Sequence, residues 1–263
     1  MNYGDIEVSI SDHVALLEIQ RPPNNFFDVG LMNSLAEAFE ALDEDADTRA
    51  LVLASQGKHF CAGNKFSTRE RDPNLPPPTP PKVEDGNPLY AAGVRLFACK
   101  KPVVAAIQGA AVGGGFGLAV MADFRVVCPE ARFTANFVKL GIHPGFGLTY
   151  TLPRIIGVQK AQHMFMTGKR IDGQTALEWG LADSLTDQAS VRVEALKLAG
   201  EIAENAPLAV MSVRATLREG IKEAVKRQTD HEHVEQFWLR DTADHKEGVK
   251  AVAQRRPGNF EAR

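Results

Sequence analysis

The chain has 263 residues, of which 44% are hydrophobic and 24% are charged, as is usual for a folded globular protein. Its formal net charge of -3 lacks the strongly basic character of nucleic-acid-binding domains. No segment approaches the ~20 consecutive apolar residues of a membrane span, and the N-terminus lacks a signal-peptide pattern. We therefore expect a soluble protein with neither nucleic acid nor membrane as a partner.

Three cysteines, Cys61, Cys99 and Cys128, lie far apart in the sequence and form no CxxC pair. An odd number of separated cysteines is typical of reduced thiols, and it indicates neither a disulfide framework nor a zinc site. We therefore predict a cytoplasmic protein without a metal centre.

The first fifty residues predict a hairpin followed by a helix. Alternating patterns at 6–11 and 14–19, separated by a polar break, predict two strands joined by a turn. Asp28 stands at the N-cap position of a segment in which apolar residues recur with helical spacing. These apolar residues are Leu31, Met32, Leu35, Ala36, Phe39 and Leu42.

Prolines are concentrated between residues 71 and 90, where seven of the fifteen prolines lie. Such density is incompatible with a continuing helix or a central strand. We predict a long loop here, which serves either as a substrate lid or as a surface excursion, because loops of this length are uncommon and are often functional.

Strands alternate with helices in the middle of the chain. Apolar runs at 50–54, 103–107 and 124–128 predict buried strands, with a short helix ending near Cys99 and another helix beginning in the glycine-rich segment that follows residue 107. This alternation predicts a parallel sheet built from βαβ units.

The chain beyond Pro153 has an almost wholly helical pattern. Alanine-rich amphipathic segments at 190–205, 208–228 and 231–252 predict a C-terminal helical extension that packs on a neighbouring surface or subunit. We divide the chain into a β/α core, 1–200, and a C-terminal helical oligomerisation region, 201–263.

Two glycine-containing turns, 59–66 and 112–117, each follow a predicted buried strand. At a strand-to-helix junction the first helical N–H groups lack internal acceptors and lie at the positive end of the helix dipole, so they can donate to a developing anion. Glycine lets a ligand approach such a backbone closely. The two turns are therefore the candidate chemical site.

The spacing of these turns carries a family resemblance. Phe60-x-Ala62-Gly63, followed about fifty residues later by Gly109-x-x-x-Gly113-Gly114-Gly115, resembles the enoyl-CoA hydratase/isomerase (crotonase) family. Matching segments extend over nearly the whole chain; they are Arg21-Pro22 with Asn25, Gly141 to Gly147, Leu152 to Gly157, Ala176 to Ala182, Lys246-Glu247-Gly248, and Arg255-Arg256-Pro257 with Phe260.

The resemblance implies an α/β fold, a crotonase-like β/α superhelix of the ClpP/crotonase type with a C-terminal helical trimerisation region. It also implies a homo-oligomer, either a trimer or a dimer of trimers. Coenzyme A would enter as part of an acyl-CoA thioester substrate, with no separate cofactor.

The resemblance further implies that the backbone N–H groups of Asn64 and Gly114 form an oxyanion hole. The coenzyme A channel would then be lined by Phe26, Lys58, Ala62, Phe66 and Gly113. His143 lies on the turn that family members fold against the acyl group, so it is a candidate for proton transfer, although we favour the interpretation as a structural histidine.

The expected acyl pocket departs from the family pattern. Hydratases of the family use two glutamates, whereas this chain has Gly117 and Phe137 at the matching positions, and Gly145 stands where some members carry an aspartate. The predicted pocket residues are Phe116, Gly117, Phe137 and Gly145, and Phe27 and Phe146 add to its apolar character. The pocket is therefore short of acids and bases.

Other motifs are weak. The glycine-rich turn lacks the GxGxxG spacing of a dinucleotide site, and neither a P-loop nor a GxSxG elbow occurs. His231-Glu232-His233 does not share one helix face, so we interpret it as a solvated helix start and not as a zinc site. Cys61 has no identifiable base, so we interpret it as a small buried residue.

Three functions stay open. The first is an acyl-CoA enzyme of the hydratase/isomerase type, in which Asn64 and Gly114 polarise the thioester. The second is a non-catalytic acyl-CoA-binding protein, favoured by Gly117 and Phe137. The third is a decarboxylase or hydrolase of acyl-CoA, which needs fewer acids and bases because the oxyanion hole itself supplies much of the stabilisation.

Overall fold

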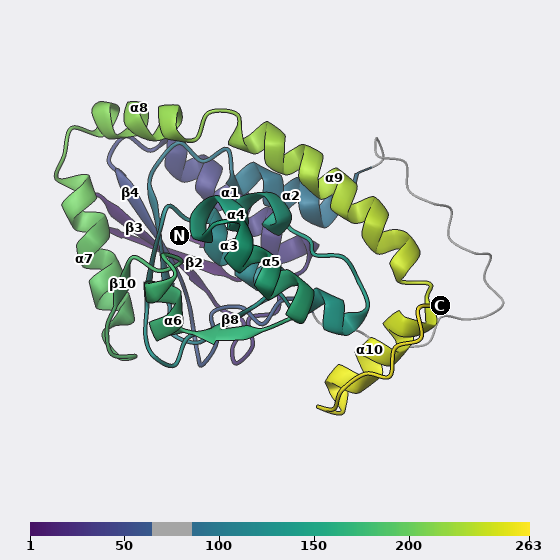
Figure 1. Cartoon of the computed structure of the whole chain (residues 1–263). Helices are drawn as coiled ribbons and strands as arrows, with labels where there is room; N and C mark the ends of the chain where they lie inside the picture. Colours follow the sequence, from purple (N-terminus) through teal and green to yellow (C-terminus); the bar gives the residue numbers. More distant parts are fainter. Residues whose placement is uncertain (65–85) are drawn as a thin grey trace.

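The computed structural model describes residues 1–64 and 86–263, and its centre is a seven-stranded sheet with the order β1-β2-β3-β4-β5-β7-β10 (Figure 1). The strands are β1 (Asn2–Tyr3), β2 (Ile6–Ser11), β3 (Val14–Ile19), β4 (Ala50–Ser55), β5 (Val103–Ile107), β7 (Phe124–Val127) and β10 (Ser184–Leu185). Most of the predicted long loop, 71–85, lies outside the described residues.

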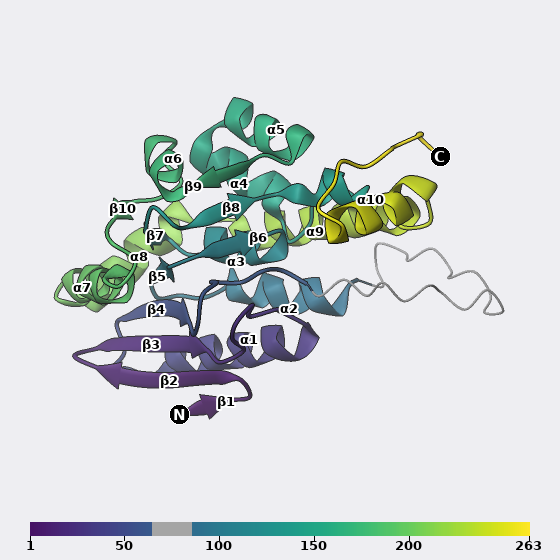
Figure 2. The same ribbon diagram turned by 90° about the horizontal axis from the view of Figure 1, so that it is seen from below.

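A second sheet of three short strands adjoins the first. It contains β6 (Ala110–Val112), β8 (Arg132–Thr134) and β9 (Arg170–Asp172) in the order β6-β8-β9. Figure 2 shows the strands of both sheets stacked as successive layers beside helices α1, α2 and α3. The sequence patterns miss these strands because three residues are too few to show a period.

The helices surround these sheets. They are α1 (Val29–Glu44), α2 (Pro88–Leu96), α3 (Gly114–Met121), α4 (Leu148–Ile156), α5 (Val158–Thr167), α6 (Gly173–Glu178), α7 (Val191–Ala203), α8 (Pro207–Leu217), α9 (Ile221–Leu239), α10 (Ala243–Ala253) and a 3-10 helix, η2 (Asn136–Leu140). In the described part of the chain, no helix combines the length and the apolar character that crossing a membrane requires.

The predicted hairpin and first helix are confirmed. Strands β2 and β3 pair antiparallel up to Ser11 and Val14, and the two residues between them, Asp12 and His13, have φ of 50° and 66°, as a type I′ turn requires. The carboxylate of Asp28 accepts from the N–H of Leu31 at 2.8 Å and caps α1.

The predicted parallel sheet is also confirmed. Strands β3, β4, β5, β7 and β10 pair parallel with one another in that order, and every residue of β4 and β5 is buried. Helix α7 packs on β3, β4, β5 and β7. A parallel strand that is covered on both faces becomes uniformly apolar, and this burial accounts for the continuous hydrophobic runs.

The C-terminal helices differ from the prediction. The helix expected at 208–228 is broken by Gly220, whose φ of 70° lies in the left-handed region, so α8 ends and α9 begins on either side of it. The division at residue 200 falls inside α7, and α9 packs on both α2 and α4. The C-terminal region is therefore partly continuous with the core.

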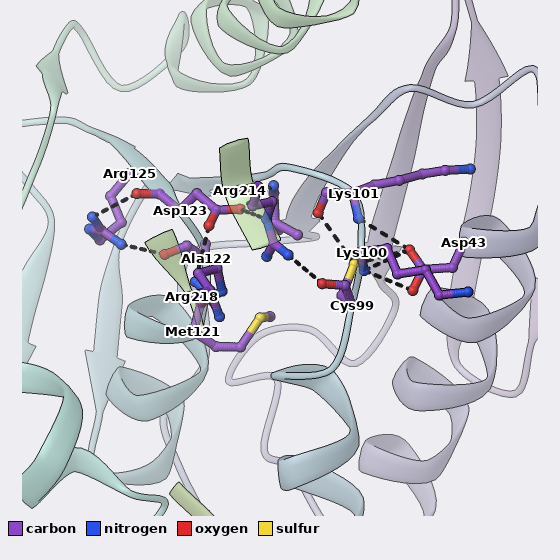
Figure 3. Close-up of polar contacts among 11 residues, drawn as sticks. Asp43, Cys99, Lys100, Lys101, Met121, Ala122, Asp123, Arg125, Arg214 and Arg218 are labelled. Carbon is purple, nitrogen blue, oxygen red and sulfur yellow. Dashed lines mark hydrogen bonds and ion pairs between the residues drawn. The ribbon is translucent and has the colours of Figure 1, made fainter. Parts of the chain in front are cut away.

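Helix α8 is attached to the core by charged side chains (Figure 3). Arg214 is the buried residue of α8, and its Nε donates to Oδ2 of Asp123 at 2.8 Å, while Nη1 of Arg218 donates to Oδ1 at 3.0 Å. Arg214 also donates to the carbonyl of Cys99. Asp123 follows the end of α3, so these contacts fix α8 against the helix that begins in the glycine triplet.

Candidate active site

The two glycine-containing turns lie against each other. The N–H of Cys61 donates to the carbonyl of Ala110, and the N–H of Val112 donates to the carbonyl of Cys61, both at 3.0 Å. These bonds make Cys61 and Ala111 partners in an isolated parallel bridge. The turn 61–64 is therefore fixed beside the segment that leads into α3.

This contact requires glycine at two positions. A Cβ on Gly109 would lie 2.0 Å from the carbonyl oxygen of Lys58, and a Cβ on Gly115 would lie 2.2 Å from the carbonyl oxygen of Cys61. Backbone meets backbone at both points, so no flexible side chain can move aside to make room for a methyl group.

Asn25 connects a third segment to this arrangement. Its side chain is fully buried, and Nδ2 donates to the carbonyl of Gln56 at 2.8 Å and to that of His59 at 2.7 Å. Its Oδ1 accepts from the N–H of Arg21 at 3.1 Å. The sequence marks Asn25 only through the family resemblance, whereas the structure gives its physical role.

Residues 24–27 then run along the first turn. The N–H of Ala62 donates to the carbonyl of Asn24 at 2.9 Å, and the N–H of Phe27 donates to the carbonyl of Gly63 at 3.1 Å. These bonds hold the Phe27 side chain at the start of α3.

The structure brings Asn64 and Gly114 into the same small region. A Cβ on Gly63 would lie 4.0 Å from the nitrogen of Gly114, and Asn64 follows directly. Gly114 is the first residue of α3, and within residues 1–64 and 86–263 neither its N–H nor that of Asn64 donates to a protein acceptor. Asn64 is exposed and Gly114 is half-buried.

Phenylalanine rings cover the glycine face of α3. A Cβ on Gly113 would meet the ring of Phe137 at 3.5 Å, and a Cβ on Gly114 would meet the ring of Phe27 at 2.1 Å. Both rings are buried. The side of α3 that faces the predicted acyl pocket is therefore apolar and aromatic.

Phe146 covers the next turn of α3. Its ring lies between two glycines, because a Cβ on Gly117 would come within 2.6 Å of it and a Cβ on Gly93 of α2 within 3.0 Å. The ring also contacts that of Phe27, with centroids 5.9 Å apart. Phe146 has a φ of 64°, a left-handed conformation that costs a bulky residue roughly 1–3 kcal/mol and persists only where the surroundings hold it.

Two other predicted pocket residues have different surroundings. Phe116 packs on Phe133 of β8, with ring centroids 5.5 Å apart, and lies on a different side of α3 from Gly114 because residues two apart in a helix point in nearly opposite directions. At Gly145, the space for a side chain is taken by the hydroxyl of Tyr90, 2.2 Å from the ideal Cβ position.

The predicted coenzyme A residues lie along the first turn and the start of α3. Lys58 is exposed, Phe26 and Ala62 are half-buried, and Gly113 is buried directly before Gly114. Phe66, the fifth residue of this set, lies outside the described residues.

His143 is not among the rings that cover α3. Its Nδ1 lies 2.8 Å from the carbonyl oxygen of Pro144, and its imidazole contacts that of the exposed His231 at 5.8 Å between centroids. Cys61 is fully buried, and burial raises the pKa of its thiol to about 12. A thiol that stays protonated is a poor nucleophile, which supports the interpretation of Cys61 as a buried structural residue.

Sequence reasoning missed three polar residues behind this site. Glu232 and Gln236 of α9 are buried, and the buried hydroxyl of Tyr90 donates to Oε1 of Gln236 at 2.9 Å. The interpretation of 231–233 as a solvated helix start is wrong, because α9 is continuous there. The spacing of Val225, Thr229, Glu232 and Gln236 could have indicated a buried stripe, since steps of four and three residues follow one helix face.

Burial changes the protonation of two of these groups. Burial raises the pKa of the Glu232 carboxyl to about 7, although hydrogen bonds from Thr149 and Gly147 oppose the shift. Burial also raises the pKa of Tyr90, and the neighbouring Glu232 carboxylate raises it further. Tyr90 is therefore a neutral hydrogen-bond donor.

Helix α10 supports the segment that carries Phe137. A Cβ on Gly248 would lie 2.6 Å from the carbonyl carbon of Leu140, so α10 packs directly on the backbone of η2. Nδ1 of His245 lies 2.6 Å from the carbonyl oxygen of Leu140. The C-terminal helices thus contact the segments that present the aromatic rings.

Comparison with known proteins agrees with this arrangement. Residues 9–263 match the family model described as enoyl-CoA hydratase/isomerase. A "probable enoyl-CoA hydratase" of Mycobacterium tuberculosis is 34% identical over 82% of each chain, and the (E)-benzylidenesuccinyl-CoA hydratase of Thauera aromatica is 32% identical over 97% of this chain and 98% of its own. The crystal structure of an enoyl-CoA hydratase/isomerase from Pseudoalteromonas atlantica superposes with a TM-score of 0.84 at 27% identity, covering 98% of this chain and 100% of that chain. These likenesses confirm the crotonase-type α/β fold.

The contact between Gly117 and Phe146 gives a testable prediction. Gly117→Ala places a methyl 2.6 Å from the Phe146 ring and is expected to destabilise the protein by about 1–3 kcal/mol through overpacking. Phe146→Leu removes part of the obstruction, so the double variant is expected to lose less stability than the sum of the single variants. Urea unfolding followed by circular dichroism measures both effects.

Gly200→Ala is the control for this cycle. Gly200 lies within α7, where an added Cβ meets nothing within 4 Å, so alanine is expected to stabilise the helix by roughly 0.5–1 kcal/mol. Strictly additive effects of Gly117→Ala and Phe146→Leu would contradict the proposed contact.

Proposed function

The chain belongs to the enoyl-CoA hydratase/isomerase family, and from this premise we propose that it binds an acyl-CoA thioester and polarises the thioester carbonyl between the N–H groups of Asn64 and Gly114. In this proposal coenzyme A enters as part of the substrate, along the segment that carries Lys58 and Ala62; the predicted contact of Phe66 lies outside the described residues. The three cysteines of the chain are free and buried, which is compatible with a cytoplasmic location.

The adjacency of the two turns carries the proposal. The bridge between Cys61 and Ala111 holds the first turn against the start of α3, and the N–H groups at both points have no protein acceptor within residues 1–64 and 86–263. Fixed donors of this kind stabilise negative charge on a thioester oxygen without reorganising during the reaction. The result is acidification of the carbon next to the carbonyl, the first requirement of enolate chemistry.

The apolar covering of α3 limits the chemistry that can follow. The nearest side chains to Gly113, Gly114 and Gly117 are phenylalanine rings, and none of these can exchange a proton. We therefore propose an enolate-forming reaction that does not rely on a pair of glutamates to activate water. His143 remains the proposed proton-transfer group, provided that its ring turns away from His231 toward the substrate.

The second candidate function is acyl-CoA binding without turnover. The observation that favours it is the same aromatic covering, because Phe146 fills the space beside Gly117 in which a family hydratase carries its first glutamate. A binding protein needs the oxyanion donors for recognition but needs no acid or base.

The phenylalanine rings that cover α3 also limit the size of the acyl group. Phe27 and Phe146 contact each other and lie over Gly114 and Gly117, so a long chain cannot run along this side of α3 unless the rings move. We propose a compact acyl group as the preferred substrate.

A matched pair of ligands tests the oxyanion hole. Butyryl-CoA carries the thioester oxygen, and S-butyl-CoA, a thioether, lacks it. Two hydrogen bonds from fixed N–H donors contribute about 1–3 kcal/mol in total, so butyryl-CoA is expected to bind about 5- to 150-fold more tightly by titration calorimetry. Equal affinities for the two ligands would overturn the role of Asn64 and Gly114, and free coenzyme A serves as the reference for contacts outside the acyl group.

Hydration of crotonyl-CoA is expected to be very slow. General acid–base groups contribute roughly a hundred- to ten-thousand-fold each, and neither Gly117 nor Phe137 can supply one. Steady-state absorbance at the enoyl thioester band measures the rate. Parent turnover near ~10 per second would contradict this expectation, and its loss in His143→Ala would then identify the responsible group.

Introducing glutamates at residues 117 and 137 tests whether their absence is what limits hydration. Gly117→Glu with Phe137→Glu is expected to gain little, because the new side chain at 117 collides with Phe146. Adding Phe146→Ala provides the missing space, so the triple variant is expected to hydrate faster than the double variant. A double variant that is already as fast as the triple variant would show that Phe146 does not obstruct the position.

We also propose that the chain forms a homotrimer or a dimer of trimers through its C-terminal helices. The supporting observation is the exposure of apolar side chains on α8, where Leu208, Val213 and Leu217 are 77%, 60% and 76% exposed. Val213 and Leu217 lie one helical turn apart on the same face, and exposed apolar side chains of this kind commonly mark a protein–protein contact.

Light scattering tests this assembly. The full-length chain is expected to have the mass of three or six copies, and Leu208→Glu with Leu217→Glu is expected to reduce it by placing charge in the contact. Val158→Glu on α5 is the control, because Val158 is exposed to a similar extent, 61%, but lies on another helix. A monomeric parent at micromolar concentration would overturn the proposal.

A further inference from the structure

Helix α9 buries a carboxylic acid and an amide toward the loop that carries Phe146. Glu232 is fully buried and Gln236 is 2% exposed, and the two lie one helical turn apart on the face that also buries Val225 and Thr229. Burying such groups is costly unless they are hydrogen-bonded. The hydrogen-bond partners of Glu232 and Gln236 therefore indicate which segment these two side chains hold in place.

Glu232 fixes the end of the Phe146 loop. Its Oε2 accepts from the N–H of Gly147 at 2.7 Å, and its Oε1 accepts from the N–H of Thr149 at 3.2 Å and from the Thr149 hydroxyl at 2.5 Å. Gly147 is the N-cap residue of α4 and has no side chain with which to cap the helix. Glu232 supplies that cap from a different helix, directly after Phe146.

Gln236 fixes the beginning of the loop. Its Nε2 donates to the carbonyl of His143 at 2.9 Å, while its Oε1 accepts from the hydroxyl of Tyr90 at 2.9 Å and from Nη2 of Arg240 at 3.2 Å. The amide oxygen accepts from two donors and the amide nitrogen donates to one carbonyl, so the group cannot rotate without losing a partner. Both ends of the segment 143–149 are therefore held by adjacent turns of one helix.

Glu232 and Gln236 are the two anchors of this loop, and the residue with a strained backbone, Phe146, lies between the points that they hold. Phe146 has a φ of 64°, and its ring is inserted between Gly93 and Gly117. A strained backbone persists only while its surroundings determine it, so the anchors and the ring position depend on each other.

We infer that Glu232 and Gln236 are positioning residues that hold the Phe146 ring on Gly117 and thereby restrict the acyl group that the site accepts. The inference rests on the proposed acyl-CoA function and extends it to residues that touch no substrate. Removal of either anchor releases the loop, the ring leaves Gly117, and a longer acyl chain gains the vacated space.

The test compares acetyl-CoA and octanoyl-CoA binding by titration calorimetry. Each methylene that enters an apolar site contributes about fourfold in affinity, so the octanoyl-to-acetyl affinity ratio is expected to rise about tenfold or more in Glu232→Ala and in Gln236→Ala. Glu232→Gln keeps one acceptor for Gly147 and is expected to fall between the parent and Glu232→Ala. A change in global stability alone would weaken both ligands and leave the ratio unchanged.

Two further variants connect the effect to Phe146. Phe146→Ala is expected to raise the ratio by itself, and adding Glu232→Ala to it is expected to raise the ratio no further, because the anchor acts through a ring that is no longer there. Glu235→Ala is the control on the same helix, because the Glu235 carboxylate bonds to Trp238 at the exposed surface. Its ratio is expected to equal that of the parent.

Hydrogen exchange of the Gly147 and Thr149 amides gives a readout that needs no ligand. Loss of a charged acceptor is expected to speed exchange about tenfold or more in Glu232→Ala. Should that variant fail to fold, Gln236→Ala and Glu232→Gln give the same comparison. If the parent binds acyl-CoA but no variant of Glu232 or Gln236 changes the octanoyl-to-acetyl affinity ratio, the inference is overturned and the proposed function is not. A parent that binds no acyl-CoA overturns the proposed function and, with it, the acyl restriction.

Discussion

The pair of backbone hydrogen bonds between Cys61 and residues 110–112 is the contact on which the site depends. It joins two turns that leave different strands of one parallel sheet, and it does so without side chains. Only glycine at 109 and 115 permits so close an approach, because any Cβ there would collide with a carbonyl oxygen. Gly63, directly before Asn64, lies close to Gly114 as a consequence of this contact.

A second constraint is the fit between glycines and aromatic rings. Small residues at 93, 114 and 117 are matched by the rings of Phe27 and Phe146, so the volume that a side chain at these positions would need is already filled. In a close-packed interior a glycine that contacts a ring can be replaced by a larger residue only if the ring is replaced by a smaller one. Gly117 and Phe146 are therefore two halves of one packing arrangement.

The C-terminal helices serve the site as well as any assembly. Helix α9 holds the loop of Phe146 through Glu232 and Gln236, and α10 packs on the 3-10 helix that carries Phe137. Helix α8 leaves Leu208, Val213 and Leu217 exposed, and Arg214 attaches it to Asp123 after the end of α3. A core that ended at residue 200 would lack the helices that support the rings of Phe146 and Phe137.

The sequence by itself determined the hairpin, the Asp28-capped helix and the buried parallel strands, because each follows from a local period or cap that the chain shows within a few residues. It also placed the two glycine turns after their strands. Only the tertiary structure decided that Phe146 lies on Gly117, that Tyr90 fills the space at Gly145, and that Glu232 is buried rather than solvated. These are contacts between residues far apart in sequence. The local sequence pattern is the same whether a polar residue such as Glu232 is buried or solvated. Only its tertiary partner, here the N–H of Gly147, distinguishes the two cases.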